Sequence, residues 1–385
     1  METTHAAAAQ RTWRLVDVAA GRAAAPAGAS GDAALDAAEG WALRGAERVG
    51  RAVAREKFGH DDQAFLAAEL STKLRHQDDQ LVRMAVAVEG ADGDPDAVVG
   101  TAVVFLPTSA NQHMAEVIVE VRPGARGRGL GAELAAWAEG VAREAGRGTL
   151  QSWIGFGDHA GGPQLTPTTG TGTAPAEEPG VRFALRRGYA LEQVERRSQL
   201  DLPLDPERLA AFAADARARA AGYRVHVWHG RVPDAWVEPF AVLETRMSTD
   251  APTGGLDFRE DVRDAGRVRR TEQQIAEMGR DFVVTAAEHE ATGELAAMTM
   301  LTWHREPREF AFQWDTIVLR AHRGHRLGML VKAVNLQQLA RLRPGTRRVQ
   351  TWNAEENRHM LAINVALGFR PAGGAAAVQK LLPAR

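Results

Sequence analysis

A glycine-rich loop between a predicted strand and a predicted helix is the segment of this sequence best suited to chemistry. Val117, Val119 and Val121 alternate along one face of the strand, and the loop at 126–131 reads RGRGLG. Glycines let a backbone approach a ligand closely, and a helix start offers unpaired amides and a positive dipole end. The loop therefore predicts a receptor for a pyrophosphate group.

The same plan occurs twice in the chain. Residues 313–328 repeat the order of strand, turn, Arg-Gly-rich loop and helix found at 116–131, and Arg323 takes the place of Arg126. Neither loop has the Gly-Lys-Ser/Thr of a P-loop, and Gly-x-Gly-x-Gly spacing fits a dinucleotide fingerprint poorly. A plain glycine-rich turn is the alternative for either loop alone. Two loops in register favour a shared function.

These motifs resemble those of one enzyme superfamily. Arg126-x-x-Gly129-x-Gly131 is similar to the Arg/Gln-x-x-Gly-x-Gly/Ala signature of the GNAT superfamily of acyl-CoA N-acyltransferases. The segment from Asn353 to Phe369 resembles its later motif, a strand, an Asn-bearing helix start and a Leu-Gly-Phe turn. The two copies cover nearly the whole chain, in a layout similar to mycothiol synthase and other tandem members. The resemblance implies acetyl-CoA, or another acyl-CoA, as co-substrate.

The resemblance also implies which residues contact CoA. In the first copy they are Val119, Val121, Arg126, Gly127, Arg128, Gly129, Leu130 and Gly131. In the second copy they are Thr316, Val318, Arg323, Gly324, His325, Arg326, Leu327, Gly328, Asn353 and Asn357. Arg326 stands where the first copy has Gly129, so it either blocks phosphate or supplies a guanidinium to it. We therefore favour the first copy for CoA binding and leave the second open.

Acyl transfer to an amine needs a group that takes the amine proton. Strand alternation puts Glu116, Glu120 and Asp315 on the same relative face of their strands, as candidate acceptors acting directly or through water. A solvated strand face is the alternative for each. Asp315 stands out because its strand is otherwise apolar. The tyrosine that the resemblance implies as general acid is missing, since Ala184 and Asn364 occupy its two places.

The elements that position these residues follow one order in both copies. In the first copy we expect helices around 33–57 and 61–76 and strands at 81–89 and 97–106. In the second copy we expect helices around 234–247 and 266–279 and strands at 281–288 and 293–303. The predicted fold class is α/β (α+β), with two tandem GNAT-like domains, each a mixed, splayed central sheet flanked by helices.

Prolines and composition changes divide the chain. We expect an N-terminal domain over 1–203, a linker helix over 204–222 and a C-terminal domain over 223–385. A segment rich in Gly, Thr and Pro at 155–180 predicts an inserted, mobile loop. The basic run Arg263–Arg270 is interpreted as a solvated helix face.

Composition excludes several classes of function. The net charge of −2 gives no reason to expect nucleic acid or a membrane as a partner. The absence of cysteine and of close histidine ligand spacing predicts no metal. No signal peptide and no stretch of about 20 apolar residues is found, so we expect a cytoplasmic protein, monomer or homodimer.

The sequence thus predicts an enzyme, an N-acetyltransferase of the GNAT type. It would transfer an acetyl or other acyl group from CoA to a primary amine of a small molecule by direct attack, with at least one copy binding CoA. The alternative is a non-catalytic acyl-CoA-binding or sensing protein on a degenerate tandem fold. The acceptor amine is not predictable, because short motifs do not define it.

Overall fold

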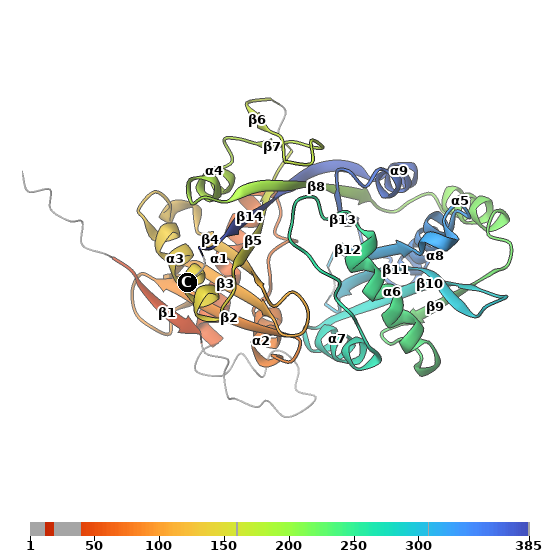
Figure 1. The fold of residues 1–385 in the computed structure, drawn as a ribbon, viewed down its shortest axis with the longest axis horizontal. Helices are drawn as coiled ribbons and strands as arrows, with labels where there is room; N and C mark the ends of the chain where they lie inside the picture. Colours follow the sequence, from red (N-terminus) through yellow and green to blue (C-terminus); the bar gives the residue numbers. More distant parts are fainter. Residues whose placement is uncertain (1–11, 19–39, 159–160, 307, 384–385) are drawn as a thin grey trace, which may run out of the picture.

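The computed structural model describes residues 12–18, 40–158, 161–306 and 308–383, and in these it is a mixed α/β protein (Figure 1). The elements of the first half (residues 12–201) are β1 (Arg14–Val18), α1 (Gly40–Phe58), α2 (Ala67–Arg75), β2 (Gln80–Val88), β3 (Val98–Pro107), β4 (Met114–Val121), α3 (Leu130–Glu144), β5 (Thr149–Phe156), β6 (Gln164–Leu165), β7 (Ala174–Pro175), α4 (Pro179–Arg186) and β8 (Ala190–Asp201).

From β9 on, the second half (residues 206–383) repeats this order, without counterparts of β6 and β7. Its elements are α5 (Pro206–Ala218), β9 (Tyr223–His229), α6 (Val237–Asp250), α7 (Ala265–Glu277), β10 (Arg280–His289), β11 (Glu294–His304), β12 (Phe310–Val318), α8 (Leu327–Leu342), β13 (Arg348–Ala354), α9 (Arg358–Leu367) and β14 (Arg370–Leu381). The expected fold class is confirmed. Residues 33–39 of the first expected helix lie outside the described residues, and α5 lies within the range expected for a linker helix.

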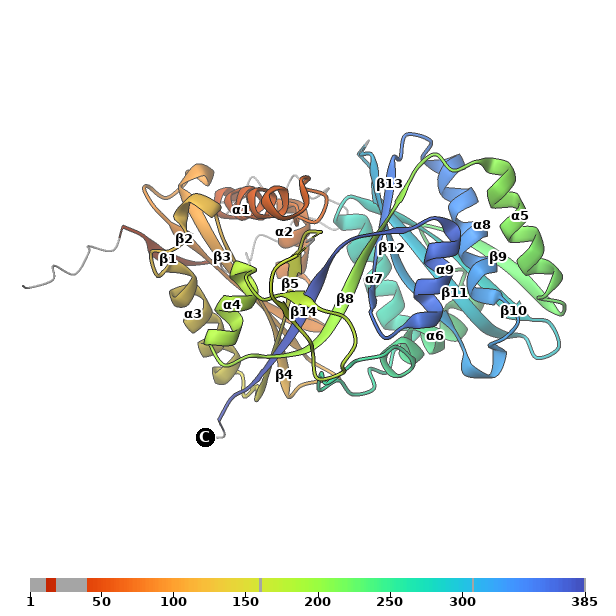
Figure 2. The ribbon, with the colours of Figure 1, turned by 90° about the horizontal axis from the view of Figure 1, so that it is seen from above.

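The large sheet contains strands of both halves, in the order β1-β2-β3-β4-β5-β14-β8-β13-β12-β11-β10-β9. The last strand of each half lies beside the other half. Strand β14 pairs with β5 from Gly374↔Phe156 to Leu381↔Thr149, and β8 pairs with β13 from Arg348↔Asp201 to Ala354↔Glu195. Figure 2 shows β8 and β14 running together between the two sets of helices. Each half is therefore completed by a strand from the other.

Two pairs of parallel strands separate partway along their length. Strands β4 and β5 pair only from Met114↔Thr149 to Glu116↔Gln151. Strands β12 and β13 pair only from Phe310↔Arg348 to Phe312↔Gln350. Beyond these pairs, alternate residues of β4 and β12 direct their amides and carbonyls into a gap rather than to a neighbouring strand. The expected splay is confirmed in both halves.

Hydrophobic cores lie on both faces of the sheet in each half. In the first half, α1 and α2 pack on one face around Val49 and Val86, and α3 packs on the other around Leu134. In the second half, α6 and α7 pack around Leu243, and α5 and α8 around Leu330. These layers fix the strands whose gaps are described above. Among the described residues, no helix combines the length and apolarity that crossing a bilayer requires.

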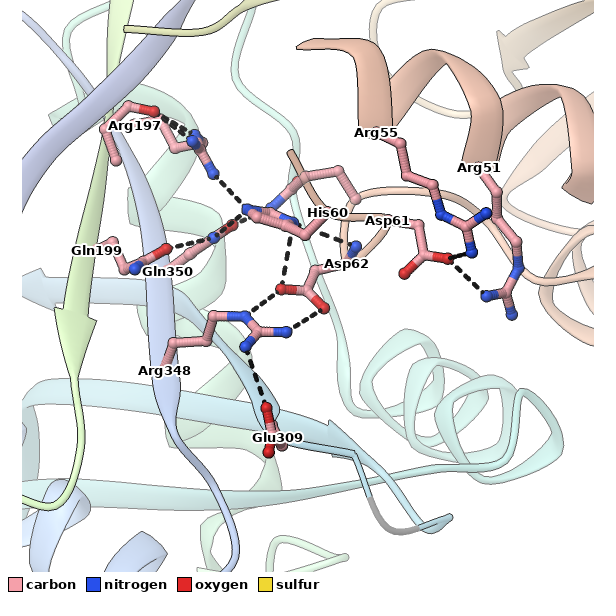
Figure 3. Close-up of polar contacts among 12 residues, drawn as sticks. Arg51, Arg55, His60, Asp61, Asp62, Arg197, Gln199, Glu309, Arg348 and Gln350 are labelled. Carbon is pink, nitrogen blue, oxygen red and sulfur yellow. Dashed lines mark hydrogen bonds and ion pairs between the residues drawn. The ribbon is translucent and has the colours of Figure 1, made fainter. Parts of the chain in front are cut away.

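A polar cluster joins the connection between α1 and α2 to strands β8 and β13 (Figure 3). The carboxylate of Asp62 binds Arg348 twice, with Oδ2 at 2.5 Å from Nε and Oδ1 at 3.1 Å from Nη2. Arg197 and Gln350 both direct nitrogen atoms at Nε2 of His60, each at 3.2 Å. Burial lowers the pKa of His60, and these two donors also favour a neutral, accepting ring nitrogen. The cluster therefore links the halves.

Helix α7 forms a second contact between the halves, with the end of α2 and the turn that follows it. Arg270 of α7 binds Asp79 twice, at 2.6 and 2.8 Å, and Nε2 of His76 lies 2.7 Å from the Glu277 carboxylate. The interpretation of Arg263–Arg270 as a solvated helix face is therefore wrong. Only 15 % of the Arg267 side chain is exposed, and it pairs with Asp261. Asp79, the partner of Arg270, lies 191 residues earlier in the sequence, so the run alone could not reveal this contact.

Asp62→Ala tests the cluster. Because the change leaves Arg348 half-buried without its bidentate partner, we expect the free energy of unfolding to fall by about 2 kcal/mol. Urea unfolding of Asp62→Ala, Arg348→Ala and the double variant would measure the coupling. Asp61→Ala is the matched control, since Asp61 pairs within the first half and its loss should cost about 0.5 kcal/mol. A coupling energy near zero between Asp62 and Arg348 would contradict the role of this pair in stabilising the contact between the halves.

Candidate functional site

A cavity of about 530 Å³ occupies the gap between β4 and β5 in the first half. The glycine-rich loop, the start of α3 and helix α4 line it on one face of the sheet, and Val53 and Lys57 of α1 line it on the other. Residues 117–121 of β4 and 152–154 of β5 form its sides. The separation of the strands thus connects the two faces of the sheet.

The loop has the backbone shape that its glycines predict. Gly127 and Gly129 have φ of 79° and 94°, and a Cβ on either would meet no atom within 4 Å. Arg126 fixes the turn, because its Nε donates to the Val121 carbonyl at 3.1 Å and its guanidinium pairs with Glu56 at 2.7 Å. Among the described residues, the amides of 127–131 have no backbone acceptor. The loop therefore presents open amides at the start of α3.

Most of the residues predicted to contact CoA in the first copy come together here. The cavity is lined by Val119, Val121, Arg126, Gly127, Gly129 and Gly131. Two others lie elsewhere. Arg128 pairs with Glu89 and lies over the Trp13 ring at 5.2 Å, and Leu130 is buried in the core.

The two carboxylates predicted on β4 differ in position. Glu120 lines the cavity, and a Cβ built on Gly50 of α1 would lie 3.3 Å from its Oε2. Burial raises the pKa of Glu120, with Lys57 and Arg126 opposing the rise. Glu116 is not among the lining residues; burial also raises its pKa, opposed by Lys73. Glu120 is therefore the carboxylate that a ligand in the cavity could reach.

Two further cavity residues bear on the chemistry. Ala184 lines the wall at the place where a tyrosine was implied, so no hydroxyl comes from that position. Tyr189, which the sequence did not single out, also lines the cavity, and burial raises its pKa. Its position directly after the Arg-Gly turn that ends α4 is the signal that could have identified it.

The loop of the second half keeps the turn, but its side chains contact other residues of the protein. Arg326 has φ 56° at the place of Gly129, and its guanidinium pairs with Asp215 of α5. Arg323 donates to the Val318 carbonyl at 3.3 Å, as Arg126 does to Val121, and pairs with Asp250 at 3.2 Å. The His325 ring lies 5.3 Å from the ring of Tyr223.

Side chains also fill the neighbouring space in the second half. Lys332 takes the place of Ala135, which lines the first cavity, and it is 1 % exposed with its Nζ 5.5 Å from the Phe369 ring. Burial lowers the pKa of Lys332 to about 7. A Cβ on Gly328 would lie 2.9 Å from Cδ1 of Ile363. Lys332 thus places a buried side chain where the first half has the small Ala135.

The other residues predicted for CoA in the second copy have structural contacts. Asn357 caps α9 by accepting from the Met360 amide at 3.3 Å, and Asn353 accepts from Asn364 at 2.7 Å. The Thr316 and Thr299 hydroxyls lie 2.7 Å apart. Val318 and Leu327 pack in the core, and Gly324 has φ 92° in the turn.

Asp315 lies in a second cavity, of about 320 Å³, between α6, α7 and β12. Burial raises its pKa to about 6. Glu244 of α6 lines the same cavity, and burial, with the charge of Asp315 adding, raises its pKa to about 7. Sequence reasoning missed Glu244, because nothing in α6 alone indicates which strand residue it faces.

Comparisons with known proteins agree with this geometry. Residues 47–158 match the acetyltransferase (GNAT) family. The chain is similar to a tandem GNAT protein from the clavulanic acid biosynthesis pathway, with 26% identity, 97% of this chain and 100% of that chain covered, and a TM-score of 0.68. A GCN5-related N-acetyltransferase from Sphaerobacter thermophilus shares the fold at 15% identity, 88% and 92% coverage and a TM-score of 0.54. No curated protein matches.

Lys332→Met tests whether the buried lysine opposes folding. The pKa of Lys332 is lowered from 10.5 to about 7, so its full cost applies below pH 7 and shrinks as the pH rises toward 10.5. We expect the variant to gain about 3 kcal/mol more unfolding free energy at pH 6.5 than at pH 9.5, at about 1.4 kcal/mol per pKa unit. Denaturant titrations at both pH values measure it.

Lys380→Met is the matched control, because Lys380 is paired with Glu139 at 3.2 Å. It should lose rather than gain stability. An equal gain for Lys332→Met at both pH values would show that burial of the charged Lys332 ammonium does not lower the free energy of unfolding.

Proposed function

We propose that this chain, which carries a GNAT acetyltransferase domain within a tandem GNAT fold, is an enzyme whose first half transfers an acetyl or other acyl group from acyl-CoA to a small-molecule primary amine. One observation carries the proposal. The cavity of the first half joins the open amides of the 126–131 loop to the carboxylate of Glu120 through the gap between β4 and β5.

The parts of this cavity match the parts of the reaction. The loop amides would hold the CoA diphosphate, and the free edge of β4 would pair with the pantetheine arm. The amine attacks the thioester carbonyl, a C–N bond forms, and the C–S bond breaks to release the CoA thiolate. A β4 amide directed into the gap would stabilise the intermediate oxyanion.

Glu120 is the proposed acceptor of the amine proton. Its pKa is raised by burial, which brings a carboxylate closer to the basicity that proton transfer near neutral pH requires. With Ala184 at the implied tyrosine position, the departing thiolate would take its proton from water.

The lack of that tyrosine favours a second candidate function, a protein that binds acyl-CoA without transferring the acyl group. The two functions differ in one observable. An acyltransferase releases free CoA thiol when an acceptor amine is present, whereas a sensor binds acetyl-CoA and releases none with any amine of a broad panel.

Gly129→Glu tests the CoA site. A carboxylate beside the diphosphate should weaken acetyl-CoA binding at least 100-fold in isothermal titration. Gly129→Ala controls for strain at this positive φ, since the added Cβ meets no atom within 4 Å. Arg326→Glu places the same charge in the second loop and should leave the single binding event intact. If Arg326→Glu removes binding and Gly129→Glu does not, the assignment to the first half fails.

Glu120→Gln tests the proton acceptor. We expect kcat for thiol release to fall by about 10²–10³ while the affinity for acetyl-CoA stays the same, because general base catalysis contributes on that scale. Glu116→Gln is the matched control on the same strand, outside the cavity lining. A larger loss in Glu116→Gln than in Glu120→Gln would transfer the role to Glu116.

A further inference from the structure

Glu120, the carboxylate proposed to accept the amine proton, shares its cavity with a lysine of helix α1. We propose that Lys57 is a positioning residue whose ammonium ion keeps Glu120 ionised and able to take the proton from the amine. The inference rests on the proposed function and deepens it, because it names the group that prepares Glu120 for the reaction.

One face of α1 lies against this cavity. A Cβ built on Gly50 would lie 3.3 Å from Oε2 of Glu120, and Val53 and Lys57 line the cavity at the third and seventh positions after Gly50. Residues at this spacing share one face of a helix. Lys57 therefore lies on the face of α1 that meets Glu120.

Among the described residues, the ammonium ion of Lys57 has its ion pair with the residue just before α4. Its Nζ lies 3.6 Å from Oε1 of Glu178, and the two side chains are only 18 % and 10 % exposed. Helices α1 and α4 pack on opposite faces of the sheet, and both residues line the cavity, so the pair spans the opening between β4 and β5. A charge held there, away from most of the solvent, is weakly screened by salt.

Lys57 acts on Glu120 through its charge. Burial raises the pKa of Glu120, and Lys57, followed by Arg126, opposes the rise; no hydrogen bond to this carboxylate is found among the described residues. Arg126 is engaged elsewhere, by Glu56 at 2.7 Å and by the Val121 carbonyl. Lys57 is therefore the main cation that favours the ionised form of Glu120.

The second half lacks both members of this arrangement. The residue that pairs with the first loop arginine is Glu56 in the first half and Asp250 in the second. The residue that follows it is Lys57 in the first half and Ala251 in the second, and Ile317 takes the place of the β4 carboxylate. The lysine and the carboxylate thus occur together in one half and are both absent from the other, as expected if they act together.

The lysine serves the proton-transfer step. A buried carboxylate that is already protonated cannot accept a proton, whereas a nearby ammonium ion stabilises the ionised form that can. As the amine attacks, one of its protons moves to the Glu120 carboxylate, and Lys57 neither gives nor takes a proton. Its charge therefore sets the lowest pH at which the reaction proceeds at full rate.

A carboxyl-carbon NMR titration of the whole chain, without acyl-CoA, tests this link. The glutamate side-chain carboxyls carry ¹³C, and the Glu120 resonance is the one missing from Glu120→Gln. We expect Lys57→Met to raise the midpoint of the Glu120 titration, because burial is then opposed less, and Lys57→Arg to restore it. Arg55→Met is the matched control in the last turn of α1, since Arg55 pairs with Asp61 at 2.6 Å (Figure 3) and should not affect the midpoint.

Glu178→Gln makes the opposite change. It removes the other carboxylate that holds the Lys57 ammonium ion, so the midpoint of the Glu120 titration should fall. If Glu178 acts through Lys57, this fall should vanish when Glu178→Gln is combined with Lys57→Met.

The pH dependence of thiol release connects the titration to catalysis. On the acidic limb of kcat/KM, where the rate follows the ionised fraction of Glu120, Lys57→Met should be about 3- to 10-fold slower than the wild type. At higher pH the two rates should agree again, and Lys57→Arg should follow the wild type throughout. A purely structural role for Lys57 would lower the rate equally at all pH values.

Three results would overturn the inference: an unmoved Glu120 midpoint in Lys57→Met, a shift of the same size in Arg55→Met, or a loss of rate that is equal at all pH values. Absence of thiol release from the wild type with every amine would instead contradict the proposed function. The NMR titration would in that case still decide whether Lys57 controls the ionisation of Glu120.

Discussion

The separation of β4 from β5 after Glu116 is the constraint on which the rest of the first half depends. A strand inside a sheet normally uses both edges for hydrogen bonds, and here one edge of β4 is released just before the glycine-rich loop. The opening leaves backbone groups of β4 free and connects the two faces of the sheet. The first turn of α3 points at the same space. Residues of α1, α3 and α4 line this opening.

The two halves use this common frame differently. In the first, small residues such as Gly129 and Ala135 keep the space beside the loop open. In the second, Arg326 and Lys332 stand at these positions, and the acidic cavity lies on the opposite face, toward α6 and α7. The same fold therefore carries different side chains at corresponding positions of its two halves.

The features that could be predicted are those that depend on residues close together in the sequence. The loop, the alternating strands and the order of elements in each copy follow from local patterns, and Glu120 follows from strand alternation. The contacts that join distant segments were not predictable. Glu244 meets Asp315 only through packing of α6 on β12, Arg270 meets Asp79 across the halves, and the exchange of β8 and β14 leaves both copies with the expected local pattern.

The exchanged strands also affect how the protein is made. During synthesis, β5 emerges long before residues 370–381, the strand that will lie beside it. Until then its edge is exposed, and an exposed strand edge is a template for pairing with other chains. The nascent first half therefore depends on timely completion of the second. A pause in translation between them would prolong the period in which the polypeptide is prone to aggregate.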